Sequence, residues 1–235
     1  MDIDALEKLL QERASNPSEG AIKLVHTIPV HHNPTGVTMC NAKRERLVQL
    51  ACEYNFHIVA DEAYQLLGFG PSPVVPLYYH DSVDDPRVYS LGTFSKLIGP
   101  GVKVGWIQAH PKLLAPITEM GVFQSGNNPV TFSSVCIADF VRSGALKEQI
   151  QYVSSELERK CRLLVQELKE AGLEPFEPTG GYFVWVKRRG EDGKMTGRNG
   201  VGMSLERDRY KHYMRLCFAW LGDAQIASGA RYLRE

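Results

Sequence analysis

Apolar, β-branched runs alternate with a helical pattern in the first half of this 235-residue chain, and this alternation constrains the fold most. Residues 22–30 (IKLVHTIPV) and 56–60 (FHIVA) have the composition of buried strands. Between them, residues 41–54 have the apolar spacing of a helix, with the asparagine that opens it as its cap. We expect further strands at 87–91 and 102–109. Strands joined through a helix by short connections run parallel, so the sequence predicts an α/β domain with an open, mostly parallel sheet.

The second half of the chain has a different pattern. Residues 144–172 repeat apolar positions every three to four residues, which predicts a long helix that Gly172 ends. Residues 180–186 (GGYFVWV) indicate a turn that leads into a strand, and residues 213–219 indicate another strand. The charged, glycine-rich residues 187–209 between these two strands are expected to form a loop.

This change in pattern divides the chain into two domains. We predict an α/β domain over residues 1–125 and a smaller domain over residues 126–235, which begins with helices. The boundary falls in the helical stretch around residues 110–145.

Composition excludes several classes of protein. Lys plus Arg and Asp plus Glu both number 27, so the formal net charge is zero, which argues against a duplex-DNA binder. No apolar run is long enough to span a membrane, and the acidic, helix-like N-terminus lacks the features of a secretory signal. Five scattered cysteines without zinc-site spacing are typical of reduced thiols. We therefore expect a cytoplasmic protein with no metal site and no nucleic-acid or membrane partner.

Four polar motifs stand out, most of them just after an expected strand. Each has an ordinary structural explanation: a turn, a helix N-terminus with Asp61 as cap and Glu62 beside the helix dipole, a surface lysine in a glycine loop, and an arginine on an edge strand. In an open α/β sheet, however, ligands bind beyond the carboxyl ends of the strands, so we expect Asn33, Asp61 and residues 93–96 at one edge. The four motifs are HNPTG at 32–36, ADEAY at 60–64, GTFSK at 92–96 and MRLCF at 214–218.

In this order and combination, the motifs resemble those of class I/II aminotransferases of pyridoxal 5′-phosphate (PLP) fold type I. The branch with the strongest resemblance holds the 2-aminoadipate and kynurenine aminotransferases. The resemblance runs from about residue 22 to the C-terminus and takes in GPGVKVGW and GGYFVWV. It implies an incomplete PLP-binding large domain with a mostly parallel sheet, followed by a smaller α+β domain.

The resemblance also implies roles around the cofactor ring. Lys96 stands where the family has the lysine that forms a Schiff base with PLP and then moves a proton between the substrate Cα and C4′. Asp61 matches the carboxylate that pairs with the pyridine nitrogen and keeps the ring protonated as an electron sink. Asn33 and Tyr64 match the residues that hydrogen-bond the 3′-oxygen of the ring.

Further roles concern the phosphate and the substrate. Thr93 and Ser95 match hydroxyl positions that hold the cofactor phosphate. Lys103 stands where the family usually has arginine, so the charge is kept but the bidentate fork is lost. Arg215 matches the arginine that binds the substrate α-carboxylate, with Asn33 as a second substrate contact. The implied substrates are α-amino acids and 2-oxo acids.

Three functions remain open at this point. The resemblance favours a transaminase, but an inactive or regulatory aminotransferase-like fragment and another PLP reaction, such as a lyase or decarboxylase, are alternatives. Relative to the family, we expect the chain to begin inside the large domain, without the upstream loop over the PLP phosphate and the aromatic that stacks on the ring. A homodimer, or pairing with a full-length subunit, is implied. We expect His31, His32 and Tyr182 to be structural or solvent-facing rather than catalytic.

Overall fold

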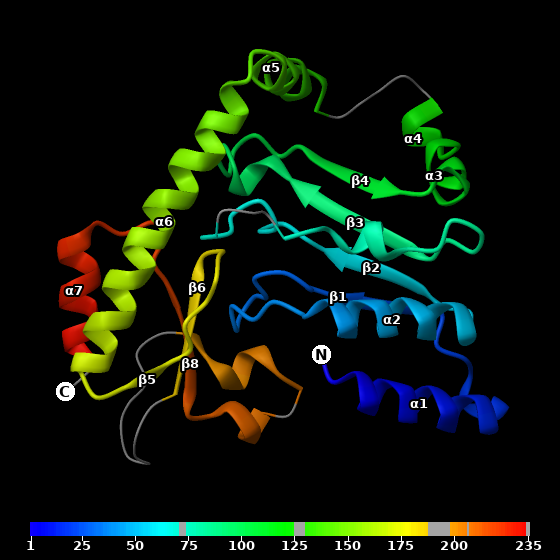
Figure 1. The fold of residues 1–235 in the computed structure, drawn as a ribbon, viewed down its shortest axis with the longest axis horizontal. Helices are drawn as coiled ribbons and strands as arrows, with labels where there is room; N and C mark the ends of the chain where they lie inside the picture. Colours follow the sequence, from blue (N-terminus) through cyan, green and yellow to red (C-terminus); the bar gives the residue numbers. More distant parts are fainter. Residues whose placement is uncertain (71–73, 125–129, 188–197, 206, 234–235) are drawn as a thin grey trace. The chain divides into compact units, whose positions relative to one another are not determined.

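A computed structural model describes residues 1–70, 74–124, 130–187, 198–205 and 207–233, which form two compact units (Figure 1). The first unit comprises Met1–Pro29, Met39–Gln65 and Val74–Gln149. The second comprises Val30–Thr38, Leu66–Pro73 and Ile150–Glu235. The predicted domain boundary after residue 125 stays a prediction.

The first unit contains most of the expected α/β elements. Its helices are α1 (Ile3–Ser15), α2 (Asn41–Glu53), α3 (Pro111–Thr118), α4 (Gly121–Gln124), α5 (Thr131–Arg142) and the short 3-10 turns η1 (Pro17–Glu19), η2 (Leu77–His80) and η3 (Phe94–Lys96). Its strands are β1 (Leu24–Thr27), β2 (His57–Asp61), β3 (Val88–Thr93) and β4 (Gly105–Ala109).

The four strands form one sheet in the order β1-β2-β3-β4. β1, β2 and β3 are parallel, which confirms the mostly parallel α/β sheet predicted from the sequence. β4 runs antiparallel to β3 instead of continuing the parallel series. The reason is local, because the short connection from residue 94 to residue 104 reverses the chain, and it contains only the 3-10 turn η3 and no α-helix that could return the chain for a parallel crossover.

The expected helix at 41–54 is present as α2, but its predicted cap is wrong. Cys40 occupies the N-cap position without a side-chain hydrogen bond, and Asn41 is the first helical residue. Met39 N–H donates to the Pro29 carbonyl (2.8 Å), which keeps the chain extended only up to Cys40, so the helix begins one residue earlier than a cap at Asn41 would require.

The segment after β2 also departs from expectation. Residues 63–66 form turns rather than the helix that would have placed Glu62 beside a helix dipole. Glu62 N–H still donates to the Leu91 carbonyl of the neighbouring strand (2.9 Å), and the glycine at position 68 and proline at position 76 do not favour a continuing helix.

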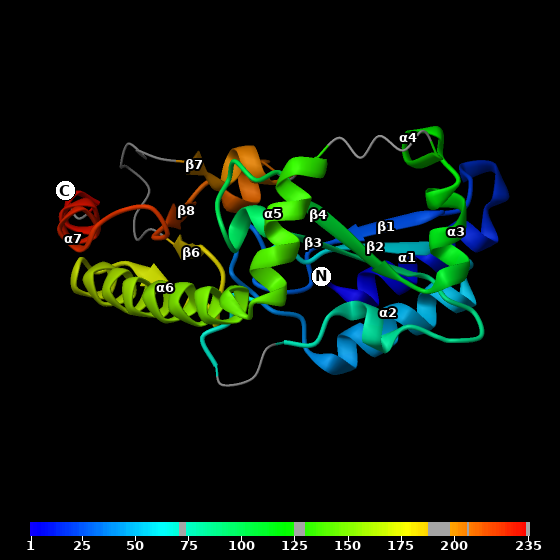
Figure 2. The same ribbon diagram turned by 90° about the horizontal axis from the view of Figure 1, so that it is seen from above.

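The two faces of the first sheet differ sharply in burial. On one face Ile58, Ala60 and Val88 are fully buried against α2, which runs along that side of the strands (Figure 2). On the other face Leu24 is 55% exposed and Ile107 is 40% exposed. Sheets with parallel strands normally bury both faces, so this second face, with its exposed apolar side chains, is one that the described residues leave only partly covered.

The second unit contains the long helix α6 (Ala145–Glu170), which starts in the first unit, and an antiparallel sheet in the order β5-β6-β8-β7. The long helix ends as predicted: Gly172 has φ +80°, Gly172 N–H donates to the Lys169 carbonyl (2.9 Å) and Leu173 N–H to the Leu168 carbonyl (3.0 Å), a Schellman motif. The other elements are β5 (Glu174–Pro175), β6 (Phe183–Lys187), β7 (Arg198–Asn199), β8 (Tyr213–Cys217), α7 (Asp223–Tyr232) and the 3-10 turns η4 (Gly200–Met203) and η5 (Arg207–Tyr210).

The predicted loop at 187–209 is only partly tested. Residues 188–197 lie outside the described residues. Beyond them the chain forms β7 and two 3-10 turns, so the expectation of an irregular loop is wrong for residues 198–203. Among the described residues, no helix is long and apolar enough to cross a bilayer.

Candidate active site

The ends of β2 and β3 bring a carboxylate and a hydroxyl to one edge of the first sheet. Asp61 is the last residue of β2 and pairs with Leu91 of the parallel strand β3. Thr93 ends β3 two residues beyond Leu91 and therefore points to the same face as Asp61. Both side chains thus lie at the carboxyl end of the parallel strands, where the sequence placed them.

The turn that follows β3 holds the next two candidates. Thr93 Oγ1 accepts a hydrogen bond from Ser95 N–H (3.1 Å) and donates to the Val104 carbonyl (3.2 Å). Phe94 N–H donates to the same carbonyl (3.0 Å). These bonds fix the short 3-10 turn that carries Ser95 and Lys96 directly beyond the strand.

Lys96 and Tyr64 meet although they are 32 positions apart. The Lys96 Nζ lies 5.8 Å from the centroid of the Tyr64 ring, within the range of a cation–π contact. Tyr64 is only 6% exposed, and Asp61 Oδ1 accepts from Ala63 N–H (3.3 Å) in the turn that carries Tyr64. The amine, the phenol and the carboxylate therefore belong to one cluster of the first unit.

Lys103 lies two residues before β4 and is exposed. It has φ +52°, a left-handed conformation that is uncommon for a residue with a side chain. Its neighbour Val104 supplies the carbonyl that binds Thr93 and Phe94, so the backbone at 103–104 is tied to the turn that carries Lys96.

The other two candidates, Asn33 and Arg215, form a pair in the second unit. Arg215 Nη1 donates to Asn33 Oδ1 at 2.7 Å, and its guanidinium carbon lies 4.3 Å from the centroid of the Phe183 ring. Asn33 precedes a cis peptide bond to Pro34, in a turn closed by Gly36 N–H and the His32 carbonyl (2.6 Å). The amide and the guanidinium are 182 positions apart in the sequence, so this pairing comes from the tertiary fold.

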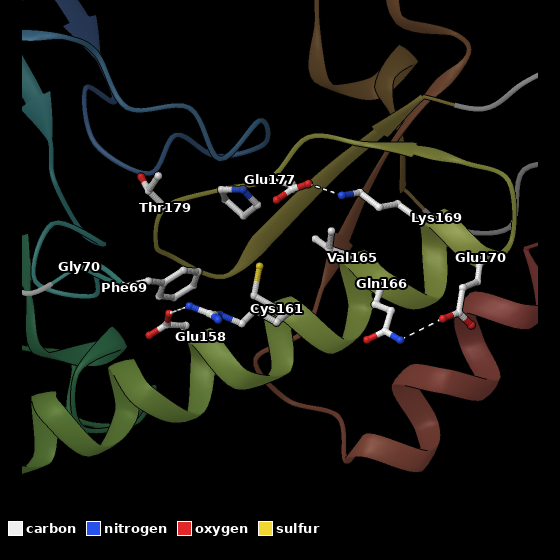
Figure 3. A pocket seen from close by; sticks show the side chains of 12 residues that line it. Phe69, Gly70, Glu158, Cys161, Val165, Gln166, Lys169, Glu170, Glu177 and Thr179 are labelled. Atoms are coloured by element: carbon white, nitrogen blue, oxygen red, sulfur yellow. Dashed lines mark hydrogen bonds and ion pairs between the residues drawn. The ribbon is translucent and has the colours of Figure 1, made fainter.

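A groove of about 700 Å³ lies elsewhere in the second unit, along α6 (Figure 3). Its lining includes the apolar side chains of Phe69 and Val165, and most of its charges are paired, as in the ion pair of Lys169 with Glu177. Burial raises the pKa of the Cys161 thiol to about 12, so this cysteine is not a nucleophile near neutral pH. We see no reactive group in this groove, and the described residues contain no cluster suited to a metal ion.

A family model for class I and II aminotransferases matches residues 1–233. The chain belongs to the class I and II aminotransferase family. PLP is the cofactor of this family, and the family match confirms the resemblance on which the sequence prediction rested.

Three of the similar proteins are archaeal aminotransferases. Aromatic-amino-acid aminotransferase 1 of Thermococcus litoralis is 34% identical, with all of this chain matched to 58% of its length. The crystal structure of a multiple substrate aminotransferase from Thermococcus profundus superposes with a TM-score of 0.86 at 32% identity, over all of this chain and 60% of that one. The structure of a Pyrococcus horikoshii kynurenine aminotransferase with PMP has the same TM-score at 29% identity and the same coverage.

These matches confirm that the chain has PLP fold type I, but they cover only part of each matched protein. The present chain spans about 60% of the length of the aminotransferases that it matches. Statements on the activity, substrates and partners of this aminotransferase chain are therefore proposals.

The residues of the first cluster fit a PLP group chemically. Asp61 offers an anion for a cationic ring nitrogen, and Lys96 offers a primary amine within reach of Tyr64. Thr93 and Ser95 offer hydroxyls on a turn whose backbone is already fixed by hydrogen bonds. The individual roles of these residues, of Lys103, and of Asn33 and Arg215 in the second unit stay predictions.

Sequence reasoning gave no functional role to two polar residues of this aminotransferase chain that the structure buries. Glu62 is buried and accepts a hydrogen bond from Leu77 N–H (2.9 Å), and burial raises the pKa of its carboxyl group. His31, taken as structural or solvent-facing, is 1% exposed and lies two residues from Asn33. No local pattern marks either residue, because the atoms that bury them come from distant segments.

Proposed function

We propose that this chain is the catalytic portion of a PLP-dependent transaminase that moves an amino group between an α-amino acid and a 2-oxo acid. The observation that carries the proposal is the approach of the Lys96 amine to the Tyr64 ring, in the same cluster as the strand-end carboxylate of Asp61. Family membership supports it, since the cluster consists of the residues that match the motifs of this family.

PLP, when bound, supplies an electron sink for the carbanion formed at the substrate Cα. The Asp61 carboxylate would hold the positive charge of the ring nitrogen by direct ion pairing. Lys96 would take the proton from the substrate Cα and return it at C4′, acting first as general base and then as general acid. The Tyr64 hydroxyl would donate a hydrogen bond to the 3′-oxygen of the ring.

The phosphate would be held by the turn after β3. The hydroxyls of Thr93 and Ser95 would donate hydrogen bonds to phosphate oxygens, and the Lys103 ammonium would add charge without the fixed orientation of a guanidinium. We expect the Lys103 contact to be weaker and more easily screened by salt, because this side chain is exposed.

Asn33 and Arg215 would bind the substrate carboxylate. A guanidinium has five N–H donors in a planar fork, so Arg215 can keep its bond to Asn33 Oδ1 and still present two parallel donors to a carboxylate. The Phe183 ring beneath the guanidinium limits its rotation. Such a pair selects ligands with a planar anion, as in α-amino and 2-oxo acids.

The test is chemical labelling. We add PLP to the purified chain, record the absorbance near 400 nm, reduce with borohydride and map the modified lysine by mass spectrometry. We expect the modification on Lys96 and its loss in Lys96→Ala, whereas Lys103→Ala retains it. A modification spread over other lysines, or none, would contradict the assignment.

A second measurement separates transamination from the alternatives. Amino acids are offered in single turnovers, and the release of the corresponding 2-oxo acid is compared with the release of carbon dioxide or ammonia. Carbon dioxide or ammonia would indicate a decarboxylase or a lyase. Labelling at Lys96 without any turnover would favour the inactive or regulatory fragment.

We also propose that the chain works as a dimer, with a second copy or with a full-length subunit of the same family. The uncovered apolar face around Leu24 and Ile107 supports this, since exposed apolar patches of this kind mark interaction surfaces. Sedimentation over a range of concentrations tests it, and a strictly monomeric chain with or without PLP would contradict it. A cytoplasmic location is proposed as well, in line with five cysteines that are all free thiols.

A further inference from the structure

His31 is buried at the base of the segment 30–38, in the second unit. It is 1% exposed and has φ +47°, a left-handed conformation that is uncommon for residues other than glycine. Because this backbone conformation is itself unfavourable, contacts with other segments have to stabilise it. The surroundings of His31 come from three separate stretches of the chain.

Two glycines form a slot for the His31 ring. A Cβ atom added to Gly180 would lie 2.3 Å from both Cε1 and Nε2 of His31, and one added to Gly181 would lie 2.9 Å from the His31 Cβ. Any side chain at position 180 would therefore overlap the ring. Gly68 also faces the ring, but a Cβ there would lie 3.6 Å from Nε2, an ordinary contact.

Thr38 ties the far end of the segment to the same histidine. His31 N–H donates to Thr38 Oγ1 (3.1 Å), and His31 Nδ1 also shares a hydrogen bond with this hydroxyl (3.2 Å). His32 N–H donates to the Val37 carbonyl (2.9 Å). These hydrogen bonds join the two ends of the segment 30–38, and Asn33 lies in the turn between them.

The slot and the support of Arg215 belong to one continuous stretch. Gly180 and Gly181 lead into β6, whose Phe183 ring packs on the Arg215 guanidinium (4.3 Å). Arg215 lies on β8, opposite Trp185 of β6. A ring seated at the start of β6 therefore sets where the segment 30–38, and with it Asn33, stands relative to Arg215.

We propose that His31 is a positioning residue, which fixes the Asn33–Arg215 hydrogen bond by seating its ring in the slot of Gly180 and Gly181. It acts through Asn33 and Arg215 and has no contact with reacting atoms. Its consequence for catalysis rests on the proposed role of that pair in binding the substrate carboxylate. The geometric part of the proposal can be tested without any reaction.

The readout is the exchange of the Arg215 guanidinium protons with water in the full chain, measured by NMR and assigned by the signals lost in Arg215→Lys. We expect His31→Ala and Gly180→Ala each to speed this exchange about tenfold, because each unseats the ring and loosens a charge-assisted hydrogen bond. A Cβ at position 180 would also lie 2.6 Å from the Leu67 carbonyl oxygen, so Gly180→Ala and His31→Ala are compared as single variants. Gly68→Ala, which faces the same ring at 3.6 Å, is the matched control and should leave the exchange unchanged.

A milder pair of variants guards against loss of folding. Thr38→Val removes the hydroxyl that binds His31 and should speed the exchange, whereas Thr38→Ser keeps the hydroxyl and should restore it. The proposal is overturned if Gly180→Ala and Thr38→Val lower the melting temperature but leave the Arg215 exchange at the wild-type rate. It is also overturned if His31→Ala leaves this exchange at the wild-type rate.

Failure of the proposed function would look different. Titration with 2-oxoglutarate tests whether the Arg215 signals respond to a 2-oxo acid. If they do not respond in the wild-type chain while His31 variants still speed the exchange, the carboxylate role is wrong and the positioning role stands. If they respond and the His31 variants bind the acid as tightly as wild type, with unchanged exchange, the positioning role is wrong.

Discussion

Two isoleucines on the same sheet allow a matched test of the uncovered face. Ile58 of β2 is fully buried on the face that α2 covers, whereas Ile107 of β4 is 40% exposed on the opposite face. Replacing either by alanine removes the same three carbon atoms. Any difference in the loss of stability therefore reports how completely each face is buried.

The expected magnitudes follow from burial. Ile58→Ala loses transfer free energy and leaves a closed cavity, so we expect a loss of about 4 kcal/mol in the free energy of unfolding. Ile107→Ala loses a little more than half of about 2.4 kcal/mol, at about 0.8 kcal/mol for each buried carbon, and leaves no closed cavity. The expected loss at Ile107 is therefore about 1.4 kcal/mol.

The assay is urea denaturation of both variants at low and high protein concentration. In a dilute monomer we expect the two losses to differ by ~2–3 kcal/mol. If a second chain covers this face, the loss at Ile107 should grow with concentration while the loss at Ile58 stays constant. Equal losses at both positions in the dilute monomer would refute the argument that the second face is uncovered.

Three other predictions concern single side chains. Burial raises the pKa of the Glu62 carboxyl group in the folded chain. The stability that the neutral carboxyl contributes is complete below the unfolded pKa of about 4.3 and is lost as pH rises through the folded pKa. Unfolding measured between pH 4 and pH 8 should therefore show Glu62→Gln gaining stability relative to wild type as pH rises. In Gly92→Ala the new Cβ would lie 2.1 Å from two atoms of the Trp106 ring, so thermal unfolding should show a loss of ~1–3 kcal/mol, whereas Gly101→Ala, with nothing within 4 Å, should show none of this loss. Arg215→Lys loses the planar fork, and in the transamination assay we expect KM for the amino acid to rise about tenfold or more with a smaller change in kcat.

The strands and long helices could be predicted from the sequence because they depend on local patterns. The β-branched runs before Asn33 and Asp61 encode β1 and β2, and Gly172 encodes the end of α6. The direction of β4 could not be predicted in this way, since it depends on a tight turn whose hydrogen bonds join Thr93 and Phe94 to Val104. Such bonds leave no periodic signal in the chain.

The candidate site was predictable to a different extent in each unit. Family motifs pointed to Lys96 and Asp61, and the structure places them in one unit around Tyr64. The same motifs pointed to Asn33 and Arg215, but the bond between them depends on sheet register and on a buried histidine. The positioning role proposed for His31 could not be predicted from the sequence, because the space for its ring is made by glycines about 150 positions away. That these glycines lie against His31 is visible only in the folded chain.

The candidate residues divide by chemistry between the two units. The first unit contributes an amine, a carboxylate and hydroxyls, groups that exchange protons or hold charge on a cofactor. The second contributes an amide and a guanidinium, planar groups whose value depends on a fixed orientation. A fixed orientation needs close backbone contact, which is what Gly180 and Gly36 provide: a Cβ at position 36 would lie 2.8 Å from Pro178. Substitutions that fill these glycine contacts should therefore change which acids bind while leaving the labelling of Lys96 intact, because the labelling depends on side chains of the first unit.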